Sequence, residues 1–579
     1  MSPAKAGMVK ERRTSLAAVT SVAQSLQGIT IEANYSAFSE SVRRRAPKGV
    51  QCAVFCGGRR CKYENPEVWD STHKAIRGIY SHWVTDEILA MARPCTEIIV
   101  KRNLIKQFQS SIGIRSIVNL QKVGEHGSCG CPLEKAGFTY DPSIFMKNKI
   151  YFYNYEWEDY GVMESSSLLD MVKVLSFALT EGKVAIHCHA GLGRTGVLIA
   201  CYLVYAVRLK ANDAIRFVRL KRPQSIQTRG QIQSVQEFEQ YILPNSIIFS
   251  KNGPTRSSST PDFSLPQYVL LQKMMLHGQE SRCLHHIPKI VLMICERLLM
   301  LCSCKPVSLI LIRNSGFVAI PVLRTFLASE SVQPKLKVSF PESQSAGTLH
   351  ETSKNAMEVV EEVPEEEEVD EKETSTEKKG EEKKISTFLR NSEEEYKYAG
   401  EPNQECIDKT VEAFLRDLSS VREEIRKKVL QFRMQLNHED GSWRKIQRET
   451  DFQVLASLLL EWLEHLRSPV LTQDHIVNII IQKDSAAAFK SFPLSCQYTL
   501  EYLLRFVNHL TIAKHDLSED LVKRIIAAAT HQAVNVRGQY LPSGKSFNNL
   551  RKGTFSRLLE FINEMMVVTA NREASTSEK

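Results

Sequence analysis

The sequence predicts an α/β domain over residues 68–250, with a mixed, partly parallel sheet flanked by helices, followed by an all-helical C-terminal region. Short apolar, β-rich runs alternate with runs of helical spacing between residues 68 and 243. Such alternation is typical of α/β domains with parallel strands. Over residues 403–568 long patterns of helical spacing return, which favours a helical fold there.

The elements of the α/β domain follow in order along the chain. Residues 114–120, 150–155 and 183–187 are apolar and β-rich, so we expect strands at these places. Residues 165–179 carry apolar side chains at 168, 169, 172, 175 and 179, which is the spacing of one helical face. Ahead of the domain, the basic residues 1–50 are predicted to be disordered.

The C-terminal region is predicted to follow a linker and to be interrupted once. Ser, Thr and Pro dominate residues 251–266, a composition typical of linkers. The further divisions are a helical segment at 267–330, an acidic insert at 335–402, a helical region at 403–568 and a tail at 569–579. The insert is predicted to be disordered because it is polar and rich in Glu.

Composition narrows the class of protein. The 579 residues carry a formal net charge of +9, and the basic surplus outside the acidic insert favours anionic partners. No apolar run is long enough to span a membrane, and the N-terminus lacks the pattern of a secretory signal. Fourteen cysteines are too few for a disulfide scaffold. We therefore expect an intracellular, cytoplasmic protein with reduced thiols.

Residues 183–196 hold the most informative pattern: an apolar strand, a Gly-containing loop and the start of an apolar helix. The backbone N–H groups of such a loop, together with the helix dipole, bind an anion. Cys188 lies in the same field, which favours its thiolate, the nucleophilic form. Arg194, six residues later, is expected to curl back and hold two phosphate oxygens. The predicted phosphate cradle consists of His189, Ala190, Gly191, Leu192, Gly193 and Arg194.

Other cysteines and histidines lie close together in the sequence and are candidate metal ligands. The candidates are Cys129 with Cys131, the group Cys52, Cys56 and Cys61, and the group Cys283, His285, His286, Cys295, Cys302 and Cys304. None reproduces a Cys-x-x-Cys pair with a matching second pair. We expect structural thiols and surface histidines here, with no metal and no cofactor.

The run His187-Cys188-x5-Arg194-Thr195-Gly196 resembles the signature of the cysteine-dependent protein tyrosine phosphatases, and the loop is similar to that of the mitotic-exit and related dual-specificity phosphatases. More widely, residues 69–243 resemble the protein tyrosine phosphatase domain-containing protein 1 family. The stretches that carry this resemblance are 116–121, 124–126, 150–153, 159–161, 170–174 and 222–231. The resemblance implies a hydrolase that works through a phosphocysteine intermediate.

The resemblance also implies roles for residues around the loop. Residues 157–163 resemble the family's mobile Trp-Pro-Asp loop, which makes Asp159 the general acid, with Glu156 and Glu158 as rival acids. Thr195 matches the hydroxyl that assists departure of the thiolate, and His187 matches the residue that braces the loop from behind. Gln227 and Gln231 either orient the hydrolytic water, as in some of these phosphatases, or are solvated residues that open a helix.

Two loop positions bear on the substrate. Related lipid phosphatases carry lysines where this chain has His189 and Leu192, so a single phosphoryl group fits better than a highly charged inositol headgroup. No Tyr-containing motif of the kind that deepens a phosphotyrosine pocket is present. The predicted enzyme is therefore a dual-specificity phosphatase whose partners are phosphorylated proteins, not nucleic acid.

The helical region has a weaker resemblance of its own. Arg313 and residues 459–471 and 499–504 resemble, in order, a degenerate Rho GTPase-activating fold, in which Arg313 matches the arginine finger. This resemblance implies a small GTPase or another protein as a partner of the helical region. The resemblance of the α/β domain further implies a role in cilium biogenesis or at the centrosome. The alternative function is a catalytically weak adaptor that binds phosphoproteins and whose helical region sets its role.

Overall fold

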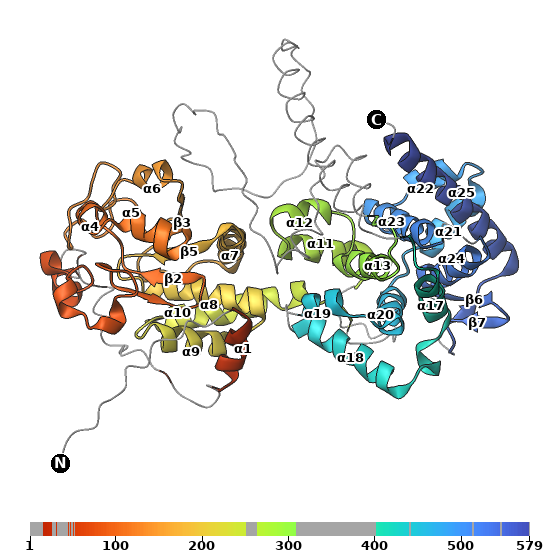
Figure 1. The fold of residues 1–579 in the computed structure, drawn as a ribbon, viewed down its shortest axis with the longest axis horizontal. Helices are drawn as coiled ribbons and strands as arrows, with labels where there is room; N and C mark the ends of the chain where they lie inside the picture. The colour runs from red at the N-terminus through yellow and green to blue at the C-terminus, as the bar shows by residue number, and fades with distance from the viewer. Residues whose placement is uncertain are drawn as a thin grey trace, which may run out of the picture.

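The computed structural model describes residues 16–25, 52–250, 263–307, 401–438, 442–511, 515–544 and 547–577, with a few isolated positions before residue 52. Figure 1 shows these residues as two lobes. One lobe holds strands β1 to β5 with the helices up to α10, and the other holds helices α11 to α25. Nearly all of the predicted acidic insert, 335–402, lies outside the described residues.

A five-stranded sheet forms the centre of the first lobe, in the order β1-β2-β5-β3-β4. Its strands are β1 (Ser81–Trp83), β2 (Ile88–Met91), β3 (Ile114–Asn119), β4 (Tyr151–Asn154) and β5 (Lys183–His187). The edge strand β1 is antiparallel to β2, and the other neighbours are parallel. This mixed, partly parallel sheet confirms the predicted fold class, and the three predicted strands are β3, β4 and β5.

The central strand β5 is buried on both faces of the sheet. Val184 and Ile186 pack into one apolar core and Ala185 packs into the other, as the two-residue period of a strand requires. The helices of the first core are α7 (Ser165–Glu181), α8 (Gly193–Val207), α9 (Ala211–Lys221) and α10 (Arg229–Ile242), and those of the second are α4 (Thr96–Lys101), α5 (Leu104–Lys106) and α6 (Ser143–Lys147). Helix α7 is the one predicted at 165–179.

The N-terminal segment differs from the prediction of disorder over residues 1–50. Helix α1 (Leu16–Ser25) lies against α9 and α8. Its Val19 and Ala23, one turn apart, are at most 1% exposed and join the core of the first lobe. This small apolar stripe was hidden in the sequence by the surrounding polar and basic residues.

The second lobe is built mainly of helices, as predicted. They are α11 (Leu265–Met275), α12 (Gly278–Cys283), α13 (Lys289–Leu301), α17 (Gln404–Leu415), α18 (Glu423–His438), α19 (Ser442–Arg448), α20 (Phe452–Glu464), α21 (Gln473–Ile481), α22 (Ser485–Lys490), α23 (Leu494–Leu510), α24 (His515–Thr530) and α25 (Lys552–Ser577). The all-helical prediction is wrong in one respect, because β6 (Gln532–Val536), β7 (Gln539–Leu541) and β8 (Asn548–Asn549) form a small sheet. The predicted linker ends earlier than expected, since α11 already begins at Leu265.

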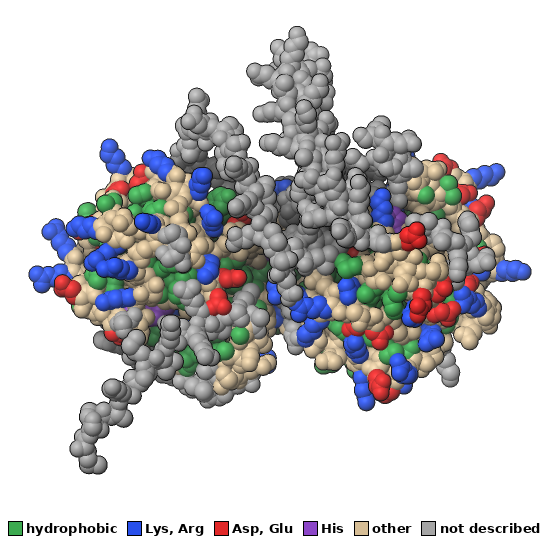
Figure 2. All heavy atoms as spheres, viewed as in Figure 1, with side chains coloured by type: hydrophobic (Ala, Val, Ile, Leu, Met, Phe, Trp, Pro, Cys, Tyr) green, Lys and Arg blue, Asp and Glu red, His purple; other side chains and the backbone are tan. Residues whose placement is uncertain are grey.

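The next features are the candidate arginine finger of the second lobe and the distribution of charge on the surface. Arg313, the candidate arginine finger, lies outside the described residues, so the resemblance to a Rho GTPase-activating fold stays a prediction. Figure 2 shows Lys and Arg side chains spread over the visible face of both lobes instead of gathered at one place. Across the described part of the chain, we find no helix with the length and apolarity needed to cross a bilayer.

Candidate active site

The predicted phosphate-binding loop connects the end of β5 to the start of α8, at the carboxyl edge of the sheet. Its turn depends on Gly191, which has a φ of 64°. A Cβ added at this residue would lie 1.8 Å from the carbonyl oxygen of Met91 on β2. Only glycine combines this φ with this approach to the neighbouring strand.

The loop carbonyls point away from the site and are held by Arg222, which is fully buried. Arg222 donates from Nη2 to the carbonyl oxygen of Ala190 at 2.8 Å and from Nε to that of Gly191. Within the described part of the chain, the amide N–H groups of residues 189–192 meet no acceptor. These amides, with the first N–H groups of α8, form a ready anion site.

Cys188 lies at the bottom of a small pocket and is 4% exposed. The pocket is lined by Phe55, Cys56, Tyr63, Asp159, Tyr160, Cys188, His189, Ala190, Gly193, Arg194, Gln227 and Gln231. Most of the predicted site residues therefore meet in one place. The aromatic wall of Phe55 and Tyr63 was not predicted.

His187 supports Cys188 from behind the loop. Its Nδ1 lies 3.1 Å from the carbonyl oxygen of Cys188, and its Nε2 lies 2.7 Å from the hydroxyl of Tyr140. Burial lowers the pKa of His187 to about 3, so the ring is neutral. A neutral ring donates from Nδ1 to the carbonyl and accepts from Tyr140 at Nε2, which fixes its orientation.

Arg194 is 1% exposed, and its guanidinium is held by a carboxylate and by backbone. Its Nη1 and Nη2 donate to the two Glu125 carboxylate oxygens at 2.7 and 2.5 Å, and Nη1 also donates to the carbonyl oxygen of Trp157 at 2.6 Å. The buried Nε has no partner in the described part of the chain. One N–H of the fork is thus left for a ligand in the pocket.

Asp159 and its rival acids lie in different surroundings. One Asp159 oxygen is 3.0 Å from Arg194 Nη2, and the other is 3.0 Å from His126 Nε2. Glu158, with its side chain 60% exposed, instead pairs with Lys122 at 2.9 Å, and Glu156 is exposed. Of the three carboxylates, only Asp159 lines the pocket with Cys188.

The charges around Asp159 set its protonation state. Burial alone would raise the pKa of Asp159, but Arg194 and His126 outweigh burial and hold the pKa well below its usual range. Burial opposes protonation of His126 as well, yet its bonds to Asp159 and Cys52 and the nearby charges of Asp159 and Glu125 raise its pKa to about 10. Without substrate, Asp159 is a carboxylate between two cations.

The two glutamines and Thr195 take different positions. Gln231 is buried and its Oε1 accepts from the backbone N–H of Gln227 at 2.8 Å, while Thr228 caps α10. Gln227 is half-buried and lines the pocket, so neither glutamine is a fully solvated residue. The buried hydroxyl of Thr195 has no partner among the described residues.

Sequence reasoning missed the residues that hold the site in shape. Arg93 donates from Nε to Glu64 at 2.8 Å and from its fork to the carbonyl oxygens of the loop that carries Glu125 and His126. Glu125 and His126 were noted only as part of a matching stretch. Their place after β3, at the same sheet edge where β5 ends, is the signal that would have pointed to them.

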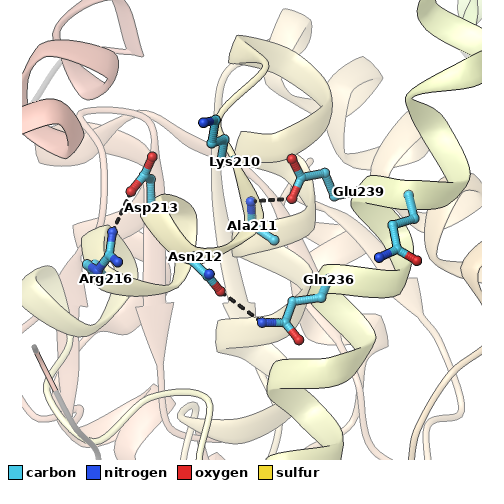
Figure 3. Close-up of a pocket in the computed structure, with 8 residues that line it drawn as sticks. Lys210, Ala211, Asn212, Asp213, Arg216, Gln236 and Glu239 are labelled. Atoms are coloured by element: carbon cyan, nitrogen blue, oxygen red, sulfur yellow. Dashed lines mark hydrogen bonds and ion pairs between the residues drawn. The ribbon is translucent and has the colours of Figure 1, made fainter. Parts of the chain in front are cut away.

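A second, more open hollow lies away from the loop, between α9 and α10 (Figure 3). Its polar side chains pair with one another. Gln236 donates to Asn212 at 2.9 Å, and the backbone N–H of Ala211 donates to Glu239 at 2.8 Å. Because it contains no residue of the catalytic loop, it is not the candidate site.

Comparison with known proteins identifies the class. Residues 98–241, within the first lobe, match the family model of the dual specificity phosphatase catalytic domain. The match covers β3 to β5, the loop with Cys188 and Arg194, and nearly all of α10.

The comparison also identifies a particular set of relatives. The chain is 56% identical over 274 residues to the protein tyrosine phosphatase domain-containing protein 1 of Bos taurus, which covers 47% of this chain and 34% of that protein. The chain thus matches about a third of the length of that curated relative.

The tyrosine-protein phosphatase CDC14 homolog of Schizosaccharomyces pombe is 37% identical over 87 residues, which is 15% of this chain and 16% of that protein. Among solved structures, Tk-PTP aligns at 20% identity and a TM-score of 0.23, over 28% of this chain and 96% of its own. The predicted family resemblance is confirmed.

Proposed function

We propose that this protein is a dual-specificity phosphoprotein phosphatase of the Cys-x5-Arg class that acts through a phosphocysteine intermediate. The observation that carries the proposal is the pocket itself. Cys188 lies beside loop amides and an Arg194 Nε–H that meet no acceptor among the residues the structure describes. A phosphoryl group supplies the acceptor oxygens that this arrangement lacks.

In the first step, the Cys188 thiolate attacks phosphorus, an S–P bond forms, and the bond from phosphorus to the leaving oxygen breaks. The loop amides and Arg194 Nε hold the equatorial oxygens while charge builds on them. Asp159 donates its proton to the leaving oxygen, so the alcohol or phenol departs neutral.

In the second step, water attacks phosphorus, the S–P bond breaks, and inorganic phosphate is released. The Asp159 carboxylate accepts a proton from this water. Gln227, which lines the pocket, orients the water, and the unpartnered hydroxyl of Thr195 donates to the departing Cys188 sulfur.

This cycle requires Asp159 to gain a proton when substrate binds. In the free protein, the charges of Arg194 and His126 hold its pKa well below the usual range. A phosphate group in the pocket places negative charge next to Asp159 and takes up the free donor of Arg194. Both effects raise the pKa of Asp159 and prepare it as the acid.

The deciding experiment assays phosphopeptides and phosphoinositides with wild type and Cys188→Ser. We expect the serine variant to lose turnover by far more than tenfold and to keep binding phosphopeptide, because the amide cradle persists while the hydroxyl is a poor nucleophile. Residual activity within about tenfold of wild type, a difference of about 1.4 kcal/mol, would show that Cys188 is not the nucleophile. Tight phosphopeptide binding by an inactive wild type would favour the adaptor alternative.

The substrate preference is part of the proposal. His189 and Leu192 are both buried, so neither projects a charge toward a second phosphate of an inositol headgroup. We expect phosphopeptides to be hydrolysed faster than phosphoinositides. Intracellular location and a role in cilium biogenesis stay predictions from the resemblance.

A further inference from the structure

Three thiols and one imidazole meet beside the catalytic loop. Cys56 and Cys61 belong to the segment before the sheet, Cys129 to the loop after β3, and His189 to the catalytic loop. The Sγ atoms of Cys61 and Cys129 each lie 3.5 Å from His189 Nε2, and Cys56 Sγ lies 4.0 Å from His189 Nδ1. All four side chains are buried, with at most 7% exposed. Residues separated by more than a hundred positions thus converge on one point.

The spacing of these atoms fits a tetrahedral metal ion. Zinc bonds sulfur at about 2.3 Å and nitrogen at about 2.0 Å, so neighbouring sulfur and nitrogen ligands lie about 3.5 Å apart. Cys61 Sγ and Cys129 Sγ each lie at this distance from His189 Nε2, so Nε2 is the ligand atom of the ring. Cys56 Sγ lies 4.0 Å from the other ring nitrogen, Nδ1, and has to turn toward the Nε2 side to complete the tetrahedron. Ligand atoms of Cys56, Cys129 and His189, one from each residue, lie within 4.8 Å of one another.

Ordinary core packing does not account for this group. Cys201 and Cys295 illustrate that role, because each lies within a large aliphatic core. The thiols of Cys56, Cys61 and Cys129 instead form a separate small cluster with Cys52, and the partly buried hydrophobic residues that pack against this cluster are Phe55 and Tyr63. A disulfide would join two of these sulfurs and leave the convergence of the others on His189 unexplained, and in the described part of the chain none of the three cysteines forms a disulfide.

The segment that carries Cys56 and Cys61 has little regular structure of its own to hold it in place. It contains only the short helical turns Cys52–Cys56, Gly58–Arg60, Pro66–Val68 and Ser71–His73. It nevertheless supplies Phe55, Cys56 and Tyr63 to the wall of the pocket. A bound ion would supply the cross-links that short turns cannot provide.

We propose that Cys56, Cys61, Cys129 and His189 bind a structural zinc ion that joins the N-terminal segment and the Glu125 loop to the catalytic loop. Four protein ligands leave no open position, so the ion has a structural role and takes no part in the chemistry. Through His189 it fixes the residue next to Cys188, and through Cys129 it fixes the loop whose Glu125 holds Arg194. The proposal goes beyond the proposed function and does not depend on it.

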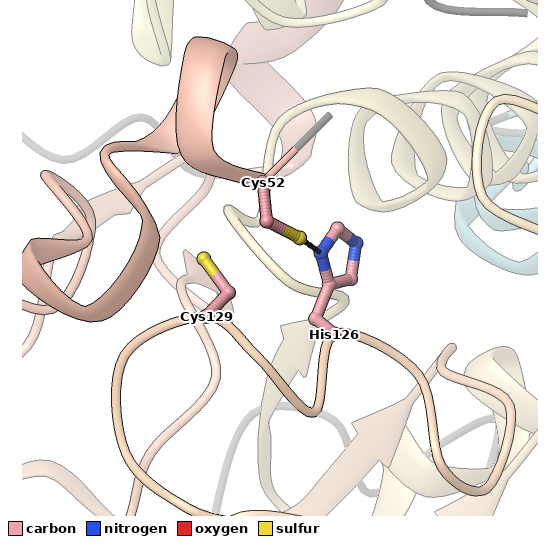
Figure 4. A group of neighbouring side chains, drawn as sticks. All are labelled: Cys52, His126 and Cys129. Carbon is pink, nitrogen blue, oxygen red and sulfur yellow. Dashed lines mark hydrogen bonds between the residues drawn. The ribbon is translucent and has the colours of Figure 1, made fainter. Parts of the chain in front are cut away.

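Cys52 is the neighbouring thiol outside this set. Figure 4 shows its sulfur directed at His126, with a distance of 3.1 Å to Nδ1, while Cys129 lies nearby. Because Cys52 already has this partner, we assign the fourth ligand to His189. The choice between the two residues is part of the test.

The first measurement is the metal content of the full chain, expressed in zinc-containing medium and purified without chelator. We expect close to one zinc ion per chain. Replacement of zinc by Co²⁺ should give the sulfur-to-metal charge-transfer bands and the intense visible bands of a tetrahedral site with thiolate ligands. A chain with neither stoichiometric zinc nor these cobalt bands would overturn the proposal without any variant.

The second measurement compares variants by metal content and circular dichroism. Cys56→Ser, Cys61→Ser and Cys129→Ser should each lose zinc, whereas the matched controls Cys283→Ser and Cys406→Ser in the second lobe should keep it. Cys52→Ser should keep zinc and His189→Asn should lose it. If Cys52→Ser loses zinc and His189→Asn keeps it, the fourth ligand is Cys52 and not His189, and the proposed ligand set is wrong. Equal zinc content in all variants would overturn the site.

Discussion

The two lobes both bury arginines, but they use them differently. In the helical lobe, Arg505 donates to Glu501 four residues earlier on the same helix. Arg524 lies 2.6 Å from Glu464 and also donates to the carbonyl oxygen of Phe414, in the last turn of helix α17. In the first lobe, which holds the candidate site, Arg93, Arg194 and Arg222 each donate to at least two backbone carbonyls of irregular loops. Helices satisfy their own carbonyls, whereas loops do not. When an arginine binds the carbonyl oxygens of a loop on one side, the N–H groups of that loop face the other side and can bind a ligand.

The largest expected effect tests this difference at Arg194. Arg194→Lys should lower kcat/KM by about 10³-fold, or about 4 kcal/mol, because a compact ammonium lacks the planar fork that spans both Glu125 oxygens and carries a separate Nε–H for phosphate. Steady-state kinetics with a phosphopeptide measures the loss. Arg524→Lys in the helical lobe is the matched control and should keep wild-type kcat/KM.

A smaller effect is expected at the acid. Asp159→Ala should slow hydrolysis of phosphoserine or phosphotyrosine peptides by about 10²-fold, because the leaving oxygen departs without a proton. An activated aryl phosphate should be affected much less. The fall in rate at high pH reports loss of the acid's proton, so this limb of the pH–rate profile should flatten, while the limb at low pH stays.

Glu158→Ala is the control for the acid. Glu158 pairs with Lys122 at the surface, so the variant should keep the limb at high pH. If Glu158→Ala flattens this limb and Asp159→Ala does not, the acid is Glu158 and the loop moves in solution.

The sequence predicted those parts of the fold that have local, periodic signals. β3, β4, β5 and α7 carry their apolar residues at strand or helix spacing, and the structure contains all four. β1 and β2 were missed because they have only three and four residues and every one is buried, which leaves no alternation to detect. Helix α1 was missed because only Val19 and Ala23 mark its buried side.

The site divides in the same way. Cys188, Arg194 and the loop between them form one contiguous sequence motif. The motif alone was therefore enough to predict that these residues lie close together. Arg222, Glu125 and Arg93 act from other loops, and their roles follow from the order of strands in the sheet, which sequence spacing does not reveal. The same reason hid the convergence of Cys56, Cys61 and Cys129 on His189, because no two of these residues form a Cys-x-x-Cys pair.

Arg222 should show a moderate effect that separates positioning from stability. Arg222→Lys should weaken binding of inorganic phosphate as a competitive inhibitor by about tenfold, because one ammonium cannot hold the carbonyls of Ala190 and Gly191 together. Arg524→Lys should lower the melting temperature without changing phosphate affinity. If the two variants lose phosphate affinity equally, Arg222 acts only through general stability.

The smallest expected effect concerns His82, whose Nδ1 accepts from Arg222 at 2.6 Å. Burial and the charge of Arg222 lower the pKa of His82 from 6.5 to about 3 in the folded protein. Between these values the unfolded chain binds a proton that the folded chain does not, so the free energy of unfolding falls as the pH falls. Between about pH 7.5 and about pH 5.5, His82 should lower the free energy of unfolding of the wild type by about 1.4 kcal/mol. His82→Gln keeps an acceptor for Arg222 but does not titrate. In urea unfolding, the free energy of unfolding of this variant should therefore fall by about 1.4 kcal/mol less than that of the wild type over the same pH range. Equal pH dependence in the two proteins would mean that His82 titrates normally and does not accept a hydrogen bond from Arg222.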